Sequence, residues 1–205
     1  VAVLTAEEFS RYGLMTSVIV LLTAALSLNI HLAPSRLFFD YDSRAEQSAL
    51  LNTTLIASSG LTAVGLLALF LVLRIGDVTD PISLGAIDLQ VLLLVAIVST
   101  VWFQFSITVM RIQADIKHYG ILYISQRIAL ISGFVGLNTL MADSFRALVL
   151  AYSASTFVSG IIGIFYCRPY LRKIQPVRRM FWDAMKFSTP IMIHSIAIWA
   201  ITSSG

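Results

Sequence analysis

Charged residues are scarce in this chain: they make up 12% of its 205 residues, whereas soluble domains usually carry about 25%. Hydrophobic residues account for 58%, and the mean hydropathy is +0.86. This composition excludes an ordinary soluble domain. It predicts a polytopic membrane protein of the all-α class, built as a bundle of transmembrane helices.

Residues that commonly carry chemistry are also few. The single cysteine, Cys167, excludes an intramolecular disulfide framework. The three histidines share no metal-ligand spacing, and no glycine-rich phosphate loop is present. Acidic pairs fall only in predicted loops, where solvated loop charge explains them. We therefore expect no catalytic residue, no metal and no cofactor, and hence a protein that is not an enzyme.

Long apolar runs dominate the rest of the chain. Each complete run has about 20 or more residues, enough to cross about 30 Å of hydrocarbon at 1.5 Å per residue. The predicted spans are Gly13–Ala33, Leu50–Leu73, Leu89–Met110, Tyr119–Met141, Phe145–Tyr166 and a last one from Ser188 to Gly205. Because the chain starts with apolar residues and stops inside an apolar run, we expect it to be part of a longer protein.

Basic residues are distributed unevenly over the connections between spans. Arg11, Arg74 and Arg146 fall in one alternating set, whereas ten fall in the other: Arg36, Arg44, Arg111, Lys117, Arg168, Arg172, Lys173, Arg178, Arg179 and Lys186. By the positive-inside rule the second set is cytoplasmic. The sequence thus predicts a multi-pass protein of the inner (plasma) membrane. Because the basic residues cluster beside a span, membrane lipids are the expected partner, and nucleic acid is not.

The basic connector before the last span is the longest connection. Val177, Phe181 and Met185 recur there at helical spacing. This pattern is typical of a short helix lying on the inner membrane surface, and a solvated basic loop is the alternative. The predicted organisation is an N-terminal transmembrane bundle over residues 1–167, the connector over 168–187, and the start of a further span over 188–205.

Small residues are spaced for close helix contact in two places. Ser155, Ser159 and Gly163 follow one another at intervals of four, and Ser132 stands four residues before Gly136. Such stripes let helix backbones approach one another. We expect both stripes to mark helix packing rather than substrate contact.

One charged residue interrupts an apolar run. Arg127 stands about 3 residues, or roughly 4.5 Å along the helix axis, from the middle of its predicted span. An arginine at this depth costs about 2.5–3.5 kcal/mol on insertion scales and roughly 10–17 kcal/mol in simulations. We therefore expect it to face a bundle interior, a water-filled cavity or an anionic ligand. A structural role, with helix carbonyls or a distant carboxylate as its partner, is the alternative.

Other polar residues in or beside the spans are weaker candidates for substrate contact. Gln126 adjoins the arginine and is a candidate hydrogen-bond donor. Arg36 stands at the cytoplasmic end of its span, where it either meets an arriving headgroup or anchors the helix. Asn29, His31 and Gln104 are further candidates, although such residues more often form hydrogen bonds between helices.

Four short segments match a family pattern in their order and spacing. Leu4–Gly13 is similar to a loop that follows a first span, with Ser10 in place of the usual glycine. Pro34–Phe39 resembles an arginine-aromatic exit from a second span, Met110–Tyr119 a basic loop before a fifth, and Lys186–Pro190 the start of a seventh. The chain thereby resembles the polysaccharide-biosynthesis or O-antigen-type flippases, which are lipid-linked oligosaccharide exporters of the multidrug/oligosaccharidyl-lipid/polysaccharide superfamily.

The resemblance implies both a substrate and a partner. Such proteins move a polyprenyl-pyrophosphate-linked glycan across the membrane by alternating access between two helix bundles. The chain would be the N-terminal bundle, from the end of span one to the start of span seven, and would work with a C-terminal bundle of the same protein. Arg127 would face the cavity and attract the pyrophosphate or an acidic sugar.

Two other functions stay open at this point. A drug or cation exporter of the same superfamily would need an acidic pocket within the membrane, and no Asp or Glu lies in the middle of a predicted span. An integral membrane polysaccharide polymerase or glycosyltransferase would be expected to carry a large extramembrane loop with catalytic residues. The longest predicted outer loop, residues 74–88, has only 15 residues.

Overall fold

A computed structural model describes residues 5–75, 87–141, 143–171 and 176–203. These residues form helices, and no strand occurs among them. The long helices are α1 (Ala6–Ser27), α3 (Arg44–Ile75), α4 (Ile87–Ile112), α5 (Ile116–Leu140), α6 (Ser144–Cys167) and α7 (Arg178–Ser203). The short elements are η1 (Ile30–Leu32), α2 (Pro34–Leu37), η2 (Phe38–Asp40) and η3 (Arg168–Tyr170). The predicted all-α class is confirmed.

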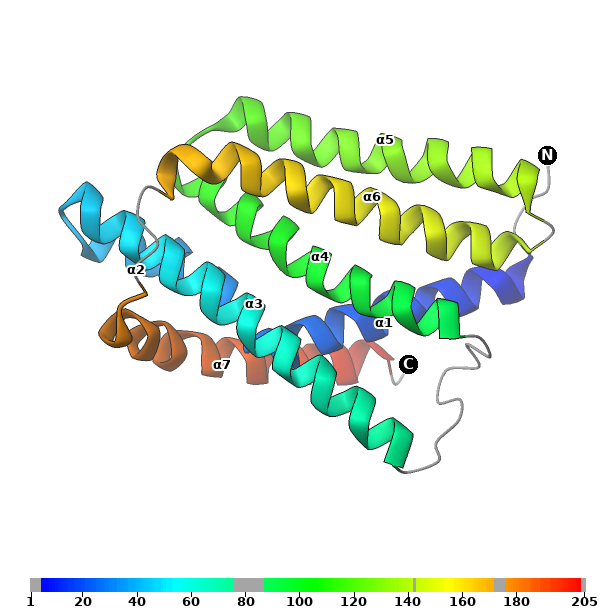
Figure 1. Ribbon diagram of the computed structural model, residues 1–205, viewed down its shortest axis with the longest axis horizontal. Helices are drawn as coiled ribbons and strands as arrows, with labels where there is room; N and C mark the ends of the chain where they lie inside the picture. Colours follow the sequence, from blue (N-terminus) through cyan, green and yellow to red (C-terminus); the bar gives the residue numbers. More distant parts are fainter. Residues whose placement is uncertain (1–4, 76–86, 142, 172–175, 204–205) are drawn as a thin grey trace.

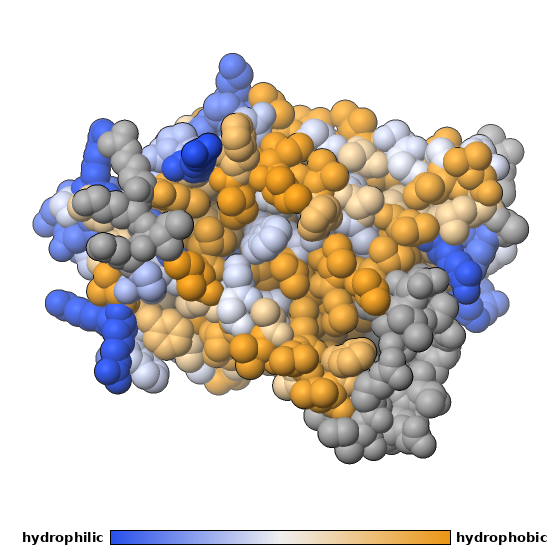
Figure 2. All heavy atoms as spheres, viewed as in Figure 1, coloured by the Kyte–Doolittle hydropathy of each residue, from blue (hydrophilic) through white to orange (hydrophobic). Residues whose placement is uncertain are grey.

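Six of the helices, all but α2, are long and apolar enough to cross a membrane. Helices α5 and α6 run along the long axis of the molecule, α4 and α3 slant across it, and α1 and α7 lie below α4 (Figure 1). Figure 2 shows apolar side chains over the middle of this face and hydrophilic ones gathered toward its two ends. This distribution suits helices that cross hydrocarbon and end at the two membrane surfaces.

Helices α4 and α6 form the centre of packing. In an 18-residue apolar stretch of each span, 56% of α4 and 50% of α6 is buried, compared with 22% or less for the other four spans. A Cβ atom added at Gly163 of α6 would lie 2.6 Å from both the Cβ and the Oγ of Ser106 on α4, so the two backbones approach closely there. Ser155 and Ser159 are buried in α6 as well. The predicted packing stripe of Ser155, Ser159 and Gly163 is confirmed.

The other predicted stripe, on α5, is wrong for the described residues. Ser132 is exposed, and a Cβ atom added at Gly136 would meet no atom within 4 Å. Gly133 packs instead, because a Cβ atom there would lie 3.6 Å from the Cβ of Ala151 on α6. The position of α6, which hydropathy does not show, decides which small residues of α5 are buried.

The first membrane helix begins earlier than hydropathy predicted. It starts at Ala6 rather than Gly13, because Thr5 and Glu8 form a capping box. The Glu8 amide donates to Thr5 Oγ1 (3.2 Å), and the Thr5 amide donates to the Glu8 carboxylate (2.8 Å). Segment 6–12, predicted as an outer loop, is therefore the first part of α1.

The same helix also ends before the predicted boundary at Ala33. Its last residue is Ser27, because Leu28 and Asn29 adopt left-handed backbone angles, with φ of 50° and 53°. This conformation costs roughly 1–2 kcal/mol per residue for non-glycine residues. The side-chain Nδ2 of Asn29 donates to Ser195 Oγ on α7 (3.1 Å), and this bond helps to hold the turn.

Helix α7 joins two segments that the sequence separated. It begins at Arg178 and continues through Pro190 to its end, so the second half of the basic connector and the last span are one helix. Phe181 and Met185 pack against a buried cluster that includes Ile30 of η1 and Ala33. The apolar face that suggested a surface-lying helix therefore contacts protein in its first turns.

A short ion pair begins α5. The carboxylate of Asp115 accepts a hydrogen bond from the His118 amide (3.3 Å), and His118 Nδ1 lies 2.7 Å from the other carboxylate oxygen. Burial acts to raise the pKa of Asp115, but these hydrogen bonds outweigh it, so the pKa lies below its ordinary value. The interaction therefore stabilises the fold above the unfolded-state pKa, and this stabilisation is lost as pH falls through the folded-state pKa.

We expect Asp115→Asn to lower the free energy of unfolding at neutral pH by about 0.3–1 kcal/mol, because it removes a negative charge at a helix N-terminus while the amide oxygen can still cap the helix. The difference from wild type should shrink below about pH 4, where the wild-type carboxyl also becomes neutral. Thermal unfolding of the purified protein between pH 7 and pH 3 measures it, with Asp42→Asn in an exposed turn as the control. A difference that stays constant over this range would contradict the assignment.

Candidate functional site

Arg127 lies near the middle of α5 and is exposed. Its guanidinium carbon lies 5.4 Å from the centre of the Tyr123 ring, one turn toward the start of the helix, in the direction in which helical side chains tilt. Among the described residues no carboxylate lies within ion-pair distance of it. A cation–π contact contributes about 0.5–2 kcal/mol, less than the insertion cost of about 2.5–3.5 kcal/mol. The Tyr123 contact alone therefore does not offset the cost of placing this charge in hydrocarbon.

Two tyrosines connect Arg127 with a second arginine. Tyr119 and Tyr123 on α5 stack with ring centres 6.1 Å apart and an angle of 12° between their planes. Beyond them, the guanidinium carbon of Arg111 lies 5.8 Å from the centre of the Tyr119 ring. We call Arg111, Tyr119, Tyr123 and Arg127 the cation–aromatic line. Its α5 part extends roughly 12 Å, from near the start of the helix to its middle.

The cation–aromatic line lies on the flank of α5 that approaches α4. The Phe103 ring of α4 is 6.3 Å from the Tyr123 ring, centre to centre. The Phe103 contact places the cation–aromatic line on the side of α5 that faces α4.

A separate stripe of α5 is apolar and open. Its residues recur at intervals of three and four, as expected for one side of a helix, and each is at least 46% exposed: Ile121, Ile124, Ile128, Ile131 and Val135. Such a surface suits contact with hydrocarbon. Helix α5 therefore carries a lipid-like face and, beside it, the cation–aromatic line.

The structure does not bring Gln126 to the face of Arg127. Gln126 is only 4% exposed, because neighbouring residues of a helix point in directions about 100° apart. Its amide oxygen Oε1 is buried and has no hydrogen-bond partner among the described residues. Gln126 turns toward the packed side of α5, and the expected pairing with Arg127 is not formed.

Gln104 is exposed on α4, directly after Phe103. Arg111 follows seven residues later, which places both on the same side of the helix. Gln104 thus lies on the α4 face that carries one end of the cation–aromatic line. Its role in substrate contact stays a prediction.

Arg36 lies apart from this line. It is exposed in α2, and its guanidinium forms an ion pair with Asp40 at 2.7 Å. Exposed pairs of this kind contribute about 0–1 kcal/mol to stability. Because Asp40 partly neutralises Arg36, the placement favours the anchoring alternative over a headgroup contact.

Asn29 and His31 lie in the packed interior, 5% and 3% exposed. Asn29 donates to Ser195 Oγ, as described above, and His31 Nδ1 lies 3.2 Å from the hydroxyl oxygen of Ser27. Both side chains therefore have partners within the protein. Their surroundings favour a role in holding helices together.

The tyrosines of the line were not among the predicted site residues. The signal was present, because Tyr119, Tyr123 and Arg127 are spaced by four and so share one flank of a helix. Tyrosine near the end of a span is also common as an interfacial anchor, which made these two residues inconspicuous. Arg111 could be placed at the line only once the α4–α5 turn was known.

Fold and site together define the class: a multi-pass, all-α membrane protein with a cationic and aromatic site along one of its membrane helices. Within the described ranges, no group of three or more His, Cys, Asp or Glu side chains is close enough to hold a metal ion. A family described as polysaccharide biosynthesis protein matches residues 1–205, so the chain belongs to this family, as the sequence motifs predicted. Among curated proteins and solved structures, none matches the chain.

Proposed function

We propose that this chain is the N-terminal bundle of a flippase of the inner (plasma) membrane. Its substrate would be a polyprenyl-pyrophosphate-linked oligosaccharide or polysaccharide precursor, as used for O-antigen and lipopolysaccharide. The observation that carries the proposal is Arg127, exposed in the middle of a membrane helix at the end of the cation–aromatic line. Family membership supports the role in polysaccharide biosynthesis.

A pyrophosphate meets the electrostatic requirement of Arg127. Guanidinium and phosphate form charge-assisted, often bidentate hydrogen bonds. At an effective dielectric constant of 20, two opposite unit charges 4 Å apart attract by about 4 kcal/mol. This exceeds the insertion cost of about 2.5–3.5 kcal/mol, so a bound anion would offset what the Tyr123 contact leaves.

The line also supplies positions along a route. Arg111, at the membrane end that the charge distribution predicts to be cytoplasmic, would meet the headgroup first. The hydroxyl groups of Tyr119 and Tyr123 would form hydrogen bonds with sugars between the two arginines, since a tyrosine hydroxyl both donates and accepts. The apolar stripe of α5 would border the lipid that keeps the polyprenyl tail. A C-terminal bundle of the same protein would form the second wall of the cavity, and alternating access would require no bond to be made or broken.

The two alternative functions have less support. In a drug or cation exporter, the guanidinium groups of this site would repel the positively charged substrate. A polymerase or glycosyltransferase would need catalytic residues, and the line consists of arginines and tyrosines with no carboxylate at ion-pair distance among the described residues. We therefore propose transport without chemical conversion.

The full-length protein reconstituted in liposomes tests this proposal. A lipid-linked oligosaccharide with a fluorescent label on its sugar is added, and an impermeant reductant quenches the label in the outer leaflet. We expect the protected fraction to change faster than in liposomes without protein. Rates equal to protein-free liposomes would contradict flipping, a lengthened glycan would identify a polymerase, and uptake of an organic cation would identify an exporter.

A further inference from the structure

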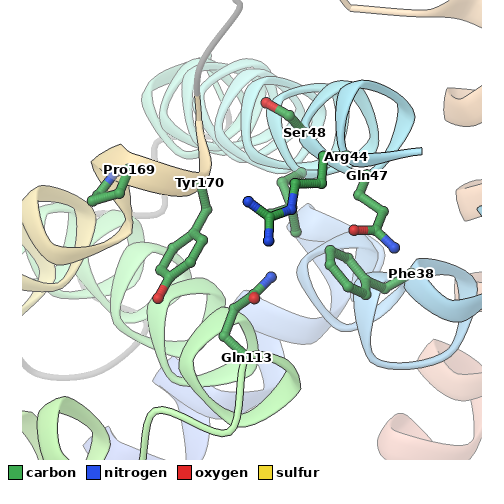
Figure 3. A pocket seen from close by; sticks show the side chains of 8 residues that line it. Phe38, Arg44, Gln47, Ser48, Gln113, Pro169 and Tyr170 are labelled. Atoms are coloured by element: carbon green, nitrogen blue, oxygen red, sulfur yellow. The ribbon is translucent and has the colours of Figure 1, made fainter. Parts of the chain in front are cut away.

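A polar cavity lies far from Arg127, at the end of the bundle where α3 begins and α4 ends. Its volume is about 260 Å³, and its lining includes Phe38, Arg44, Gln47, Gln113 and Tyr170. Figure 3 shows the Arg44 side chain directed into the space between Phe38 and Tyr170, with the amide of Gln113 across from it. Four separate elements, η2, α3, the end of α4 and η3, thus contribute to one small site.

The lining of this cavity favours an anion. It contains one arginine and no carboxylate. Among the described residues no carboxylate lies within ion-pair distance of Arg44. One N–H of the Gln47 side-chain amide donates to the Tyr41 carbonyl (2.9 Å), and Arg44, Gln113 and Tyr170 supply further donors in the lining.

Two nearby carboxylates, those of Glu46 and Asp115, have other partners. Glu46, two residues after Arg44, accepts a hydrogen bond from the Ser43 hydroxyl (2.7 Å). Asp115, whose charge reaches Tyr170, is paired with His118 at 2.7 Å. Neither acid therefore neutralises Arg44 directly.

The cavity lies at the level of membrane headgroups. Helix α3 starts at Arg44, and α4 and α6 end at Ile112 and Cys167, so three membrane helices terminate around it. Its floor is firm, because Phe38 and Leu51 are 8% and 1% exposed within a buried cluster. A headgroup in the adjacent leaflet can reach such a position without leaving the membrane surface.

We propose that this cavity binds the phosphate of a lipid headgroup. Arginine suits phosphate because its planar guanidinium offers paired donors. The cavity is smaller than most ligand pockets, which have about 300–1,000 Å³, so it fits a headgroup rather than an oligosaccharide. Free phosphate has the same chemistry and would be the other source. The site does not depend on the flippase proposal, because it lies at the membrane surface, whereas Arg127 lies roughly 17 Å along α5 from that end.

Lipid binding to the full-length protein tests this site. The delipidated protein in detergent is titrated with phosphatidylglycerol and, separately, with diacylglycerol of the same chains, and native mass spectrometry gives each Kd. We expect Arg44→Gln to weaken phosphatidylglycerol binding at least about tenfold and to leave diacylglycerol binding unchanged. Arg44→Lys should fall between the two. The matched control is Arg178→Gln, an exposed arginine at the same end of the bundle that does not line the cavity.

The outcomes separate the possible occupants. Equal phosphatidylglycerol affinity in wild type and Arg44→Gln would overturn the proposal, and so would an equal loss in Arg178→Gln, which would indicate diffuse surface charge. Displacement of the lipid by millimolar inorganic phosphate, dependent on Arg44, would support the phosphate site and assign it to a soluble phosphate. If Arg44→Gln fails to fold, Gln113→Leu tests the same cavity with the charge retained and should also weaken binding. Unchanged flipping in Arg44→Gln would not affect the result, since the readout is lipid binding.

Discussion

Replacing Arg127 with alanine is expected to lower the flipping rate of the full-length protein by about 10- to 100-fold. The change removes charge-assisted hydrogen bonds to the pyrophosphate, each contributing about 1.5–3 kcal/mol. Tyr123 remains in place, so the aromatic surface is kept while the cation is lost. The liposome assay described above measures the rate.

Arg127→Ala should lower transport without lowering the stability of the protein. Removing a charge from hydrocarbon recovers about 2.5–3.5 kcal/mol, and losing the contact with Tyr123 costs only about 0.5–2 kcal/mol. We therefore expect Arg127→Ala to unfold at the same temperature as wild type or higher. A structural arginine would instead lose stability and transport together, so thermal unfolding distinguishes the two roles.

Two further variants complete this test. Arg127→Lys keeps the charge but lacks the planar pair of donors, so partial transport is expected. Arg11→Ala is the control, because Arg11 is exposed at the start of α1 and paired with Glu7 at 2.7 Å. Full transport by Arg127→Ala at normal membrane levels would rule out a role in substrate binding.

Replacing Gly163 with alanine is expected to destabilise the bundle by about 1–3 kcal/mol, as overpacking usually does. The new Cβ would lie 2.6 Å from the Cβ of Ser106, which is fixed to the α4 backbone and cannot move alone. It would also lie 3.1 Å from a terminal methyl of Leu122, which can shift more easily. Helices α4 and α6 would have to separate, and both lie at the centre of the bundle.

A second glycine within a membrane helix offers a matched control for this substitution. Gly136 is also inside a membrane helix, but a Cβ there would meet nothing within 4 Å. Gly136→Ala should therefore be neutral or stabilise the protein by up to about 1 kcal/mol. Combining Gly163→Ala with Ser106→Gly should recover much of the lost stability. Equal unfolding temperatures for Gly163→Ala and Gly136→Ala would show that the close approach of α4 and α6 does not matter.

The positions of the membrane helices could be predicted from the sequence, whereas some of their ends could not. Hydropathy located the membrane helices, because a run of apolar residues needs no knowledge of its neighbours. It misplaced the start of α1, where the capping box of Thr5 and Glu8 extends the helix into polar sequence. It also divided α7, because the basic residues around Lys186 suggested a boundary that the helix does not have.

The sequence predicted Arg127 as a site residue but did not predict which side chains surround it. Arg127 was identified from its energetic cost alone. The inward turn of Gln126, the stacked tyrosines and the contact of Arg111 with Tyr119 depend on how α4 and α5 approach each other. Arg44 counted only as one basic residue among ten until η2, α3, α4 and η3 enclosed a cavity around it.

Composition and local pattern established the all-α class, the membrane helices and the family, because each depends on residues that are near in sequence or on their sum. The helix packing decided which small residues lie in contact, which polar side chains face a flank of α5, and where the cavity around Arg44 forms. These features depend on the relative rotation and distance of helices. Residues far apart in the chain set both quantities, as Gly163 and Ser106 illustrate.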